Sequence, residues 1–98
     1  MTAPPAFSAQ SNSRYERLST KLLEGHSDFQ ATETKAVAIL SSDPYNRSRQ
    51  HHITKLKDVP EGGGQYRLKL GLWRFRYDID GQLVLLYYCG LRREDTYR

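Results

Sequence analysis

Residues 65–89, QYRLKLGLWRFRYDIDGQLVLLYYC, decide the fold because polar and apolar residues alternate along most of this stretch. Such alternation is typical of β-strands that bury one face. Gly71-Leu72 fits a two-residue type II′ turn, and Asp80-Gly81 fits a type I′ turn. The stretch therefore predicts three consecutive antiparallel strands. The last of them, residues 82–89, is apolar on both faces, which is typical of a strand inside a sheet.

The two turns fix the register of the predicted strands. The first turn places Lys69 opposite Arg74. It also places Arg67 opposite Arg76. The second turn places Tyr87 opposite Arg74. One predicted face is a core made of Tyr66, Leu68, Leu70, Trp73, Phe75, Tyr77, Val84, Leu86 and Tyr88. The opposite face gathers Arg67, Lys69, Arg74, Arg76, Leu85, Tyr87 and Cys89.

Two pairs of like charges therefore face each other on the polar side of the predicted sheet. Each such pair destabilises an antiparallel sheet, by ~0.2–1 kcal/mol if repulsion mirrors the size of favourable pairs. Residues 65–77 contain no acidic residue that would offset this repulsion. We interpret the basic face as an anion-binding surface, and a solvated polar face without a ligand is the alternative.

The composition predicts a single small domain with an uneven distribution of charge. The chain has 98 residues, a net charge of +4 and a pI near 9.4. Residues 1–45 hold four Lys/Arg against five Asp/Glu, whereas residues 46–98 hold eleven against six. The basic half is thus the strand half, which points to nucleic acid or an acidic protein as partner.

The compartment that we expect is the cytoplasm. The chain has one cysteine, so it forms no intramolecular disulfide, which fits a reducing environment. No apolar run approaches the roughly 18 residues that a membrane span needs, and no signal peptide is visible.

The first half of the chain predicts two helices. Residues 1–12 are a flexible tail or a weak edge strand around residues 6–10. Ser13 and Glu16 form a capping box ahead of a helix over residues 14–24, which Gly25 ends. Ser27 and Gln30 form a second box, ahead of a helix that runs to about residue 41 and stops at Asp43-Pro44.

The predicted architecture is α+β. An N-terminal helical hairpin packs on one face of a three- to four-stranded antiparallel sheet, with the weak N-terminal edge strand as an addition. Residues 51–56 (HHITKL) supply the optional fourth strand. Three glycines, residues 62–64, lack the strand–loop–helix setting of a phosphate-binding loop, so we interpret them as part of a turn.

The sequence contains no pattern that indicates a metal or cofactor site. His51 and His52 are adjacent, so on a strand they point to opposite faces, and we interpret them as surface residues. Cys89 has no histidine placed beside it and is interpreted as a small filling residue. No Ser-His-Asp or paired-carboxylate arrangement stands out.

What remains for chemistry is the basic face with Tyr87, joined by Arg92, Arg93 and Tyr97 of the tail. The planar fork of arginine donates two parallel hydrogen bonds to a phosphate. Several cations around one phosphodiester would stabilise a pentavalent transition state without a metal. A tyrosine among arginines would serve as a general base or would stack on a nucleobase.

Several motifs between residues 13 and 98 follow one another in a specific order. They are 14–18 (RYERL), 41–44 (SSDP), 55–57 (KLK), 66–71 (YRLKLG), 73–80 (WRFRYDID) and 90–94 (GLRRE), followed by Tyr97. In this order and spacing the chain resembles the RelE/ParE superfamily of toxins from type II toxin–antitoxin systems.

The resemblance implies a small β-α-α-β-β-β toxin that enters the ribosomal A site and cuts messenger RNA without a metal ion. In RelE-like members the 2′-hydroxyl attacks the adjacent phosphate and leaves a 2′,3′-cyclic phosphate. The catalytic residues carried over are Arg67, Lys69, Arg74, Arg92 (or its neighbour Arg93) and Tyr97, the last as base. The RNA-binding residues that we predict are Arg76, Tyr87, Arg93, Lys55 and Lys57.

Two other functions stay open on the sequence alone. A ParE-like inhibitor of DNA gyrase would have the same fold, and a non-catalytic relative would only bind its antitoxin. The partners that we expect are a cognate antitoxin and messenger RNA on the ribosome. We expect contact with DNA only through the antitoxin complex, no membrane and no cofactor.

Overall fold

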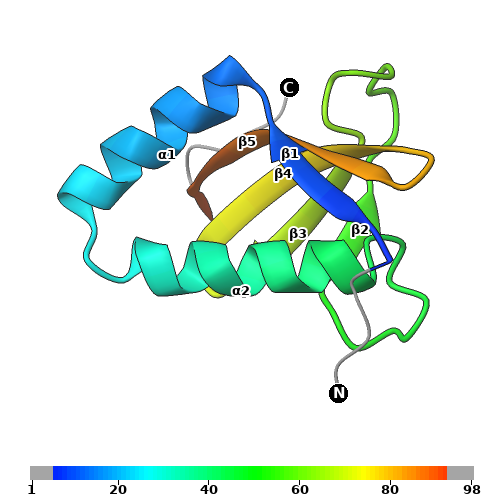
Figure 1. Ribbon diagram of the computed structural model, residues 1–98, viewed down its shortest axis with the longest axis horizontal. Coiled ribbons are helices and arrows are strands. Elements are labelled where there is room, and N and C mark those ends of the chain that lie inside the picture. The colour runs from blue at the N-terminus through cyan, green and yellow to red at the C-terminus, as the bar shows by residue number, and fades with distance from the viewer. Residues whose placement is uncertain (1–5, 93–98) are drawn as a thin grey trace.

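A computed structural model describes residues 6–92 as an α+β protein with two helices and a five-stranded sheet (Figure 1). The elements are β1 (Ser8–Ser11), α1 (Ser13–Gly25), α2 (Phe29–Ser42), β2 (Ile53–Lys55), β3 (Tyr66–Leu70), β4 (Trp73–Asp80) and β5 (Leu83–Leu91). In the sheet the strands follow the order β1-β5-β4-β3-β2. From β2 to β5 each strand runs antiparallel to its neighbour, as the sequence predicts.

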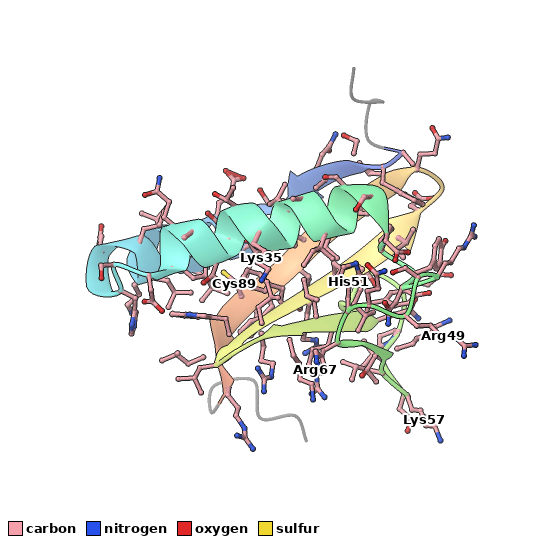
Figure 2. All side chains as sticks on the ribbon, turned by 90° about the horizontal axis from the view of Figure 1, so that it is seen from below. Lys35, Arg49, His51, Lys57, Arg67 and Cys89 are labelled. Carbon is pink, nitrogen blue, oxygen red and sulfur yellow. The ribbon has the colours of Figure 1, made fainter. Side chains whose placement is uncertain are left out.

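The sheet is mixed, which corrects the expectation of three to four antiparallel strands. Strand β1 lies at one edge and runs parallel to β5, with Ser8 opposite Leu83 and Ser11 opposite Leu86. The weak edge strand that the sequence allows is thus present, and it begins two residues and ends one residue later than expected. The chain between β1 and β2 forms both helices, which lie on the same side of the sheet (Figure 2).

Both helices start at other residues than the capping boxes indicate. The side chain of Asn12 accepts a hydrogen bond from the amide of Tyr15 at 2.8 Å, so Asn12 and not Ser13 caps α1. Helix α2 begins at Phe29, and its N-cap residue Asp28 makes no capping bond. The carboxylate of Asp28 instead accepts a hydrogen bond from the indole Nε1 of Trp73 at 3.2 Å. Here a tertiary contact has replaced the local cap.

The core fills the space between the helices and the sheet. Figure 1 shows α1 and α2 diverging from the short link that joins them, so that each covers a different part of the sheet. Phe29 of α2 lies against Trp73 and Phe75, with ring centroids 4.9 Å and 6.1 Å apart. The most deeply buried apolar residues are Phe29, Leu40, Leu68, Phe75, Tyr77 and Val84. The four strand residues of this group, Leu68, Phe75, Tyr77 and Val84, all belong to the predicted core face.

The turn between β4 and β5 lies one residue later than the sequence analysis expects. The two-residue loop is Gly81-Gln82, and Asp80 pairs with Leu83. A type I′ turn at Asp80-Gly81 would require a left-handed backbone at Asp80. Within this turn of the structure only Gly81 has a positive φ, +61°. The first turn, at Gly71-Leu72, lies where it is predicted, because Leu70 pairs with Trp73.

A β-bulge in β5 then exchanges the faces of two residues. Tyr77 pairs with Leu86, and the residue before it in β4, Arg76, pairs with Tyr88. Tyr87 is therefore the additional residue of β5. Beyond the bulge Cys89 lies opposite Phe75 and is 1% exposed. The expected position of Cys89 on the basic face is therefore wrong. Tyr88 is buried as expected, at 9% exposed, but it lies on the side of Arg76 and not on the core side of the sheet. An inserted residue shifts the alternation of the strand by one position.

Candidate nucleic-acid interface

The predicted register of the basic residues is confirmed. Arg67 lies opposite Arg76, and Lys69 lies opposite Arg74, on the antiparallel strands β3 and β4. All four side chains are partly exposed. Figure 2 shows Arg67 on the side of the sheet away from α2, whereas Cys89 lies between α2 and the sheet. We call Arg67, Lys69, Arg74 and Arg76 the cationic face.

The two arginines of β4 turn toward opposite ends of β3. The guanidinium of Arg76 donates to the carbonyls of Gly63 and Gly64, at 2.9 Å and 3.2 Å, ahead of β3. Nη1 of Arg74 donates to the carbonyl of Gly71 at 2.8 Å, just after β3. Each guanidinium is thus anchored by backbone oxygens, which fixes the direction of its remaining donors.

One carboxylate lies on the same side of β4. Asp78 is 8% exposed, and its two oxygens accept hydrogen bonds from the backbone amides of Gly64 and Gln65, at 2.9 Å and 3.0 Å. The amide of Gly63 also donates to the carbonyl of Pro60 at 3.0 Å, so the glycine segment forms the expected turn. Asp78 therefore holds this loop against the sheet, next to Arg76.

Two neighbouring tyrosines complete the cationic face at β5. In a β-bulge both residues of the bulged strand lie on the side of their common partner. Tyr87 and Tyr88 accordingly lie beside Arg76, and Cζ of Arg76 is 6.0 Å from the centroid of the Tyr87 ring. The guanidinium of Arg14, from α1, reaches the same two rings, with Cζ 5.1 Å and 6.0 Å from their centroids.

Sequence reasoning missed Tyr88 and Arg14 as members of this surface. The signal for Tyr88 is Gly90, because a glycine inside a strand often marks a bulge or a close approach. A Cβ at Gly90 would meet the hydroxyl of Tyr88 and would lie 2.9 Å from its Cζ. No local signal marks Arg14, since its position depends on how α1 packs against β5.

Other predicted site residues lie apart from the cationic face. Lys55 pairs with Tyr66, and its Nζ is 5.6 Å from that ring, so Lys55 lies on the helix side of the sheet. Lys57 follows β2 on an exposed loop and points outward (Figure 2). Arg92 ends the described segment, where its amide donates to the carbonyl of Leu72 at 2.8 Å. Arg93 and Tyr97 lie outside the described residues.

A pocket of about 640 Å³ borders Arg92 at the end of the sheet. The walls come from the link between the helices, the first turns of α2 and the turn between β3 and β4. Trp73 forms part of this wall, and its ring meets that of His26 edge to face at 5.2 Å. Asp28, Lys35 and Arg92 bring charges of both signs to the rim. The pocket is therefore mixed in character and lies at one end of the sheet.

The histidines and the cysteine are not grouped for metal binding. Within residues 6–92 no three His, Cys, Asp or Glu side chains come together as a metal would require. Nε2 of His51 lies 3.8 Å from a carboxylate oxygen of Asp43. Burial, with the nearby carboxylate of Glu33, raises the pKa of the Cys89 thiol to about 12. Because only the thiolate is nucleophilic, Cys89 is unreactive at neutral pH.

Comparisons with known proteins add no identification. No protein-family model, curated protein or solved structure matches the chain. Neither helix of the described segment has the length and apolar character needed to cross a membrane.

Proposed function

We propose that this protein is the toxin of a type II toxin–antitoxin system and that it cleaves messenger RNA on the ribosome. The observation that carries the proposal is the cationic face itself. Two like-charge pairs stand side by side on β3 and β4, on the side of the sheet that the helices leave open. A bound phosphate backbone would relieve their mutual repulsion, which gives this costly arrangement a use.

The order of the elements supports the same proposal. The chain runs β1-α1-α2-β2-β3-β4-β5, which contains the β-α-α-β-β-β order implied by the resemblance to RelE/ParE toxins, with the short β2 as an additional strand. In a RelE-like arrangement the helices would shield one face and the RNA would bind the other. The parallel pairing of β1 with β5 leaves β2 and β1 as the two edges.

In the proposed reaction the 2′-hydroxyl of one ribose attacks the adjacent phosphate. The bond from the 2′-oxygen to phosphorus forms and the bond from phosphorus to the 5′-oxygen breaks, which leaves a 2′,3′-cyclic phosphate, and the departing 5′-oxygen takes a proton from water. Arg67, Lys69 and Arg74 would bind the phosphate oxygens and stabilise the extra negative charge of the transition state. Tyr97 would accept the proton of the 2′-hydroxyl, and Arg92 would approach from the end of β5.

The proposal includes partners in the cytoplasm. A cognate antitoxin would neutralise the toxin by covering the cationic face or the helices, and an acidic segment of the antitoxin would complement the net charge of +4. Contact with DNA would pass through the antitoxin.

The test is expression of the protein in bacterial cells, followed by mapping of messenger RNA ends by primer extension. Wild-type protein should arrest growth and produce new 3′ ends within translated regions. Lys69→Gln should reduce cleavage by about tenfold or more, because it removes one charge from the transition-state site. Lys35→Gln, which removes the same charge from an exposed position on α2, is the matched control and should cleave like the wild type.

Two results would contradict the proposal. Growth arrest with intact transcripts would reject it, and gyrase-dependent DNA breakage in a supercoiling assay would then favour the ParE-like alternative. Equal cleavage by Lys69→Gln and Lys35→Gln would show that the cationic face is not the active surface.

A further inference from the structure

We propose that Arg14 of α1 is an additional RNA-binding residue, which holds a phosphate next to the scissile one, and that Tyr87 is the residue that positions it. This inference rests on the proposed function, since it concerns the path of the same RNA strand. It extends the cationic face beyond β5 to a helix that the sequence motifs do not connect with RNA.

The geometry that brings Arg14 to this face begins at the end of β1. Strand β1 stops where Ser11 pairs with Leu86, and the amide of Asn12 then donates to the carbonyl of Leu86 at 3.2 Å. Beyond Leu86 the outer edge of β5 is therefore not covered by β1. The first turn of α1, which Asn12 caps, takes the place of that strand. Arg14 lies in this turn, beside the bulge at Tyr87.

The contacts of Arg14 hold its guanidinium without neutralising it. Nη1 donates to the hydroxyl of Tyr87 at 3.3 Å, and the guanidinium lies against the rings of Tyr87 and Tyr88. Within residues 6–92 no carboxylate lies at ion-pair distance from Arg14. The side chain is exposed. Aromatic contacts leave the positive charge and most of the five donors of an arginine available to an anion.

Tyr87 connects Arg14 to the cationic face. Its ring contacts the guanidinium of Arg14 and, at 6.0 Å, that of Arg76. The positive charge of the sheet thus continues without a break onto α1. Strands β3 and β5 are two strand spacings, about 10 Å, apart, and Lys69 and Tyr87 are also displaced along the strands, since Lys69 pairs with Arg74 and Tyr87 lies beside Arg76. Arg14 and Lys69 are therefore expected to bind different phosphates, so that the ligand is a single strand of several nucleotides.

The experiment measures binding of a fluorescent single-stranded RNA oligonucleotide by anisotropy, at several salt concentrations. To prevent cleavage, the RNA carries 2′-O-methyl groups. Arg14→Gln should weaken binding about three- to tenfold and lower the salt slope of log K by about 0.7, the value for one lost phosphate contact on a single strand. Arg17→Gln is the matched control. Arg17 is an exposed arginine about one turn further along the same helix, where it borders Thr20 and Lys21.

A second measurement tests the positioning role of Tyr87. Tyr87→Leu removes both the ring and the hydroxyl, and the proposal expects it to weaken RNA binding. In combination with Arg14→Gln the loss should be smaller than the sum of the two single losses, because part of the effect of Tyr87→Leu passes through the guanidinium of Arg14. Additive losses would show that Tyr87 acts independently of Arg14 and would overturn the positioning role.

The outcomes separate this inference from the proposed function. If Lys69→Gln weakens binding and Arg14→Gln does not, Arg14 is no RNA ligand and the inference fails alone. Equal losses in Arg14→Gln and Arg17→Gln would show a general effect of charge and would overturn it as well. If Lys69→Gln also binds like the wild type, the proposed function fails and the inference fails with it.

Discussion

The side chain of Tyr88 lies over Gly90, in the space that a Cβ of residue 90 would occupy. Gly90 pairs with Arg74, so this contact lies on β5 directly beside the cationic face. It exists because the bulge at Tyr87 turns Tyr88 away from the core. The bulge and Gly90 thus act together: the bulge directs the Tyr88 ring toward the arginines of β4, and Gly90 leaves room for it.

Gly90→Ala tests the role of the contact between Tyr88 and Gly90. The new methyl group would collide with the Tyr88 ring, which must then leave its place, so we expect the free energy of unfolding to fall by about 1–3 kcal/mol. RNA binding should weaken as well. Urea denaturation followed by tryptophan fluorescence measures the first effect. Gly25→Ala is the control, because a Cβ at Gly25 meets no atom within 4 Å, and its stability should stay within about 0.5 kcal/mol of the wild type.

Because like charges face each other on the cationic face, we expect Lys69→Gln to be more stable and less active than the wild type. Lys69→Gln removes the repulsion with Arg74, so we expect the free energy of unfolding to rise by about 0.2–1 kcal/mol at low salt. The difference should shrink at 1 M salt, where the Debye length is about 3 Å. Lys35→Gln should show no such gain. A Lys69→Gln protein less stable than the wild type would mean that packing of the lysine stem outweighs the repulsion.

The first hairpin could be predicted residue by residue, and the second only in part. Strands β3 and β4 alternate strictly, and a one-residue slip would expose the whole core face, so the pairing of Arg67 with Arg76 follows from the pattern. Strand β5 is apolar on both faces, and its pattern therefore does not fix a register. Asp80-Gly81 and Gly81-Gln82 are both acceptable turns, and the bulge at Tyr87 adds a second shift.

The helix starts and the position of Arg14 depend on contacts between segments far apart in the chain. Asp28 makes no capping bond and binds the indole of Trp73, 45 residues away. Arg14 reaches Tyr87, beside the cationic face, only because β1 ends opposite Leu86. Local sequence patterns contain no information on such contacts. The four basic residues of β3 and β4 and Tyr87 could therefore be predicted from the sequence, whereas Tyr88 and Arg14 could not.

Glu33 should contribute strongly to stability, because it joins the two helices. One oxygen of Glu33 accepts hydrogen bonds from the Tyr15 hydroxyl at 2.8 Å and the Ser19 hydroxyl at 2.6 Å. Both donors are buried. Glu33→Ala would leave them without this acceptor, at a cost of about 2–4 kcal/mol. Glu33→Gln keeps a carbonyl oxygen and should cost less than half as much.

Urea denaturation of the two Glu33 variants is the measurement, and Glu24→Ala, at an exposed position of α1, is the control for loss of a carboxylate. Equal stability of Glu33→Ala and Glu24→Ala would show that the two hydroxyl groups find other partners.

Stability should decline at alkaline pH because Cys89 is buried. Burial raises the pKa of this thiol from 9.0 to about 12. Between these two values the unfolded chain loses the proton and the folded chain retains it, so stability that is complete below pH 9 is lost as the pH rises toward 12. The slope from this one group approaches about −1.4 kcal/mol per pH unit. Burial also raises the pKa of Tyr15 and of Tyr77, which act in the same direction above pH 10.

Cys89→Ser isolates the contribution of the thiol, because serine does not ionise in this range. Urea midpoints of both proteins at pH 8, 9 and 10 should diverge, with the wild type losing stability faster between pH 9 and 10. In the native protein at pH 8 the thiol should also resist alkylation by iodoacetamide, and in urea it should react readily. Parallel pH profiles of the two proteins, or rapid alkylation of the native one, would mean that the side chain of residue 89 faces solvent and that the bulge does not turn it into the core.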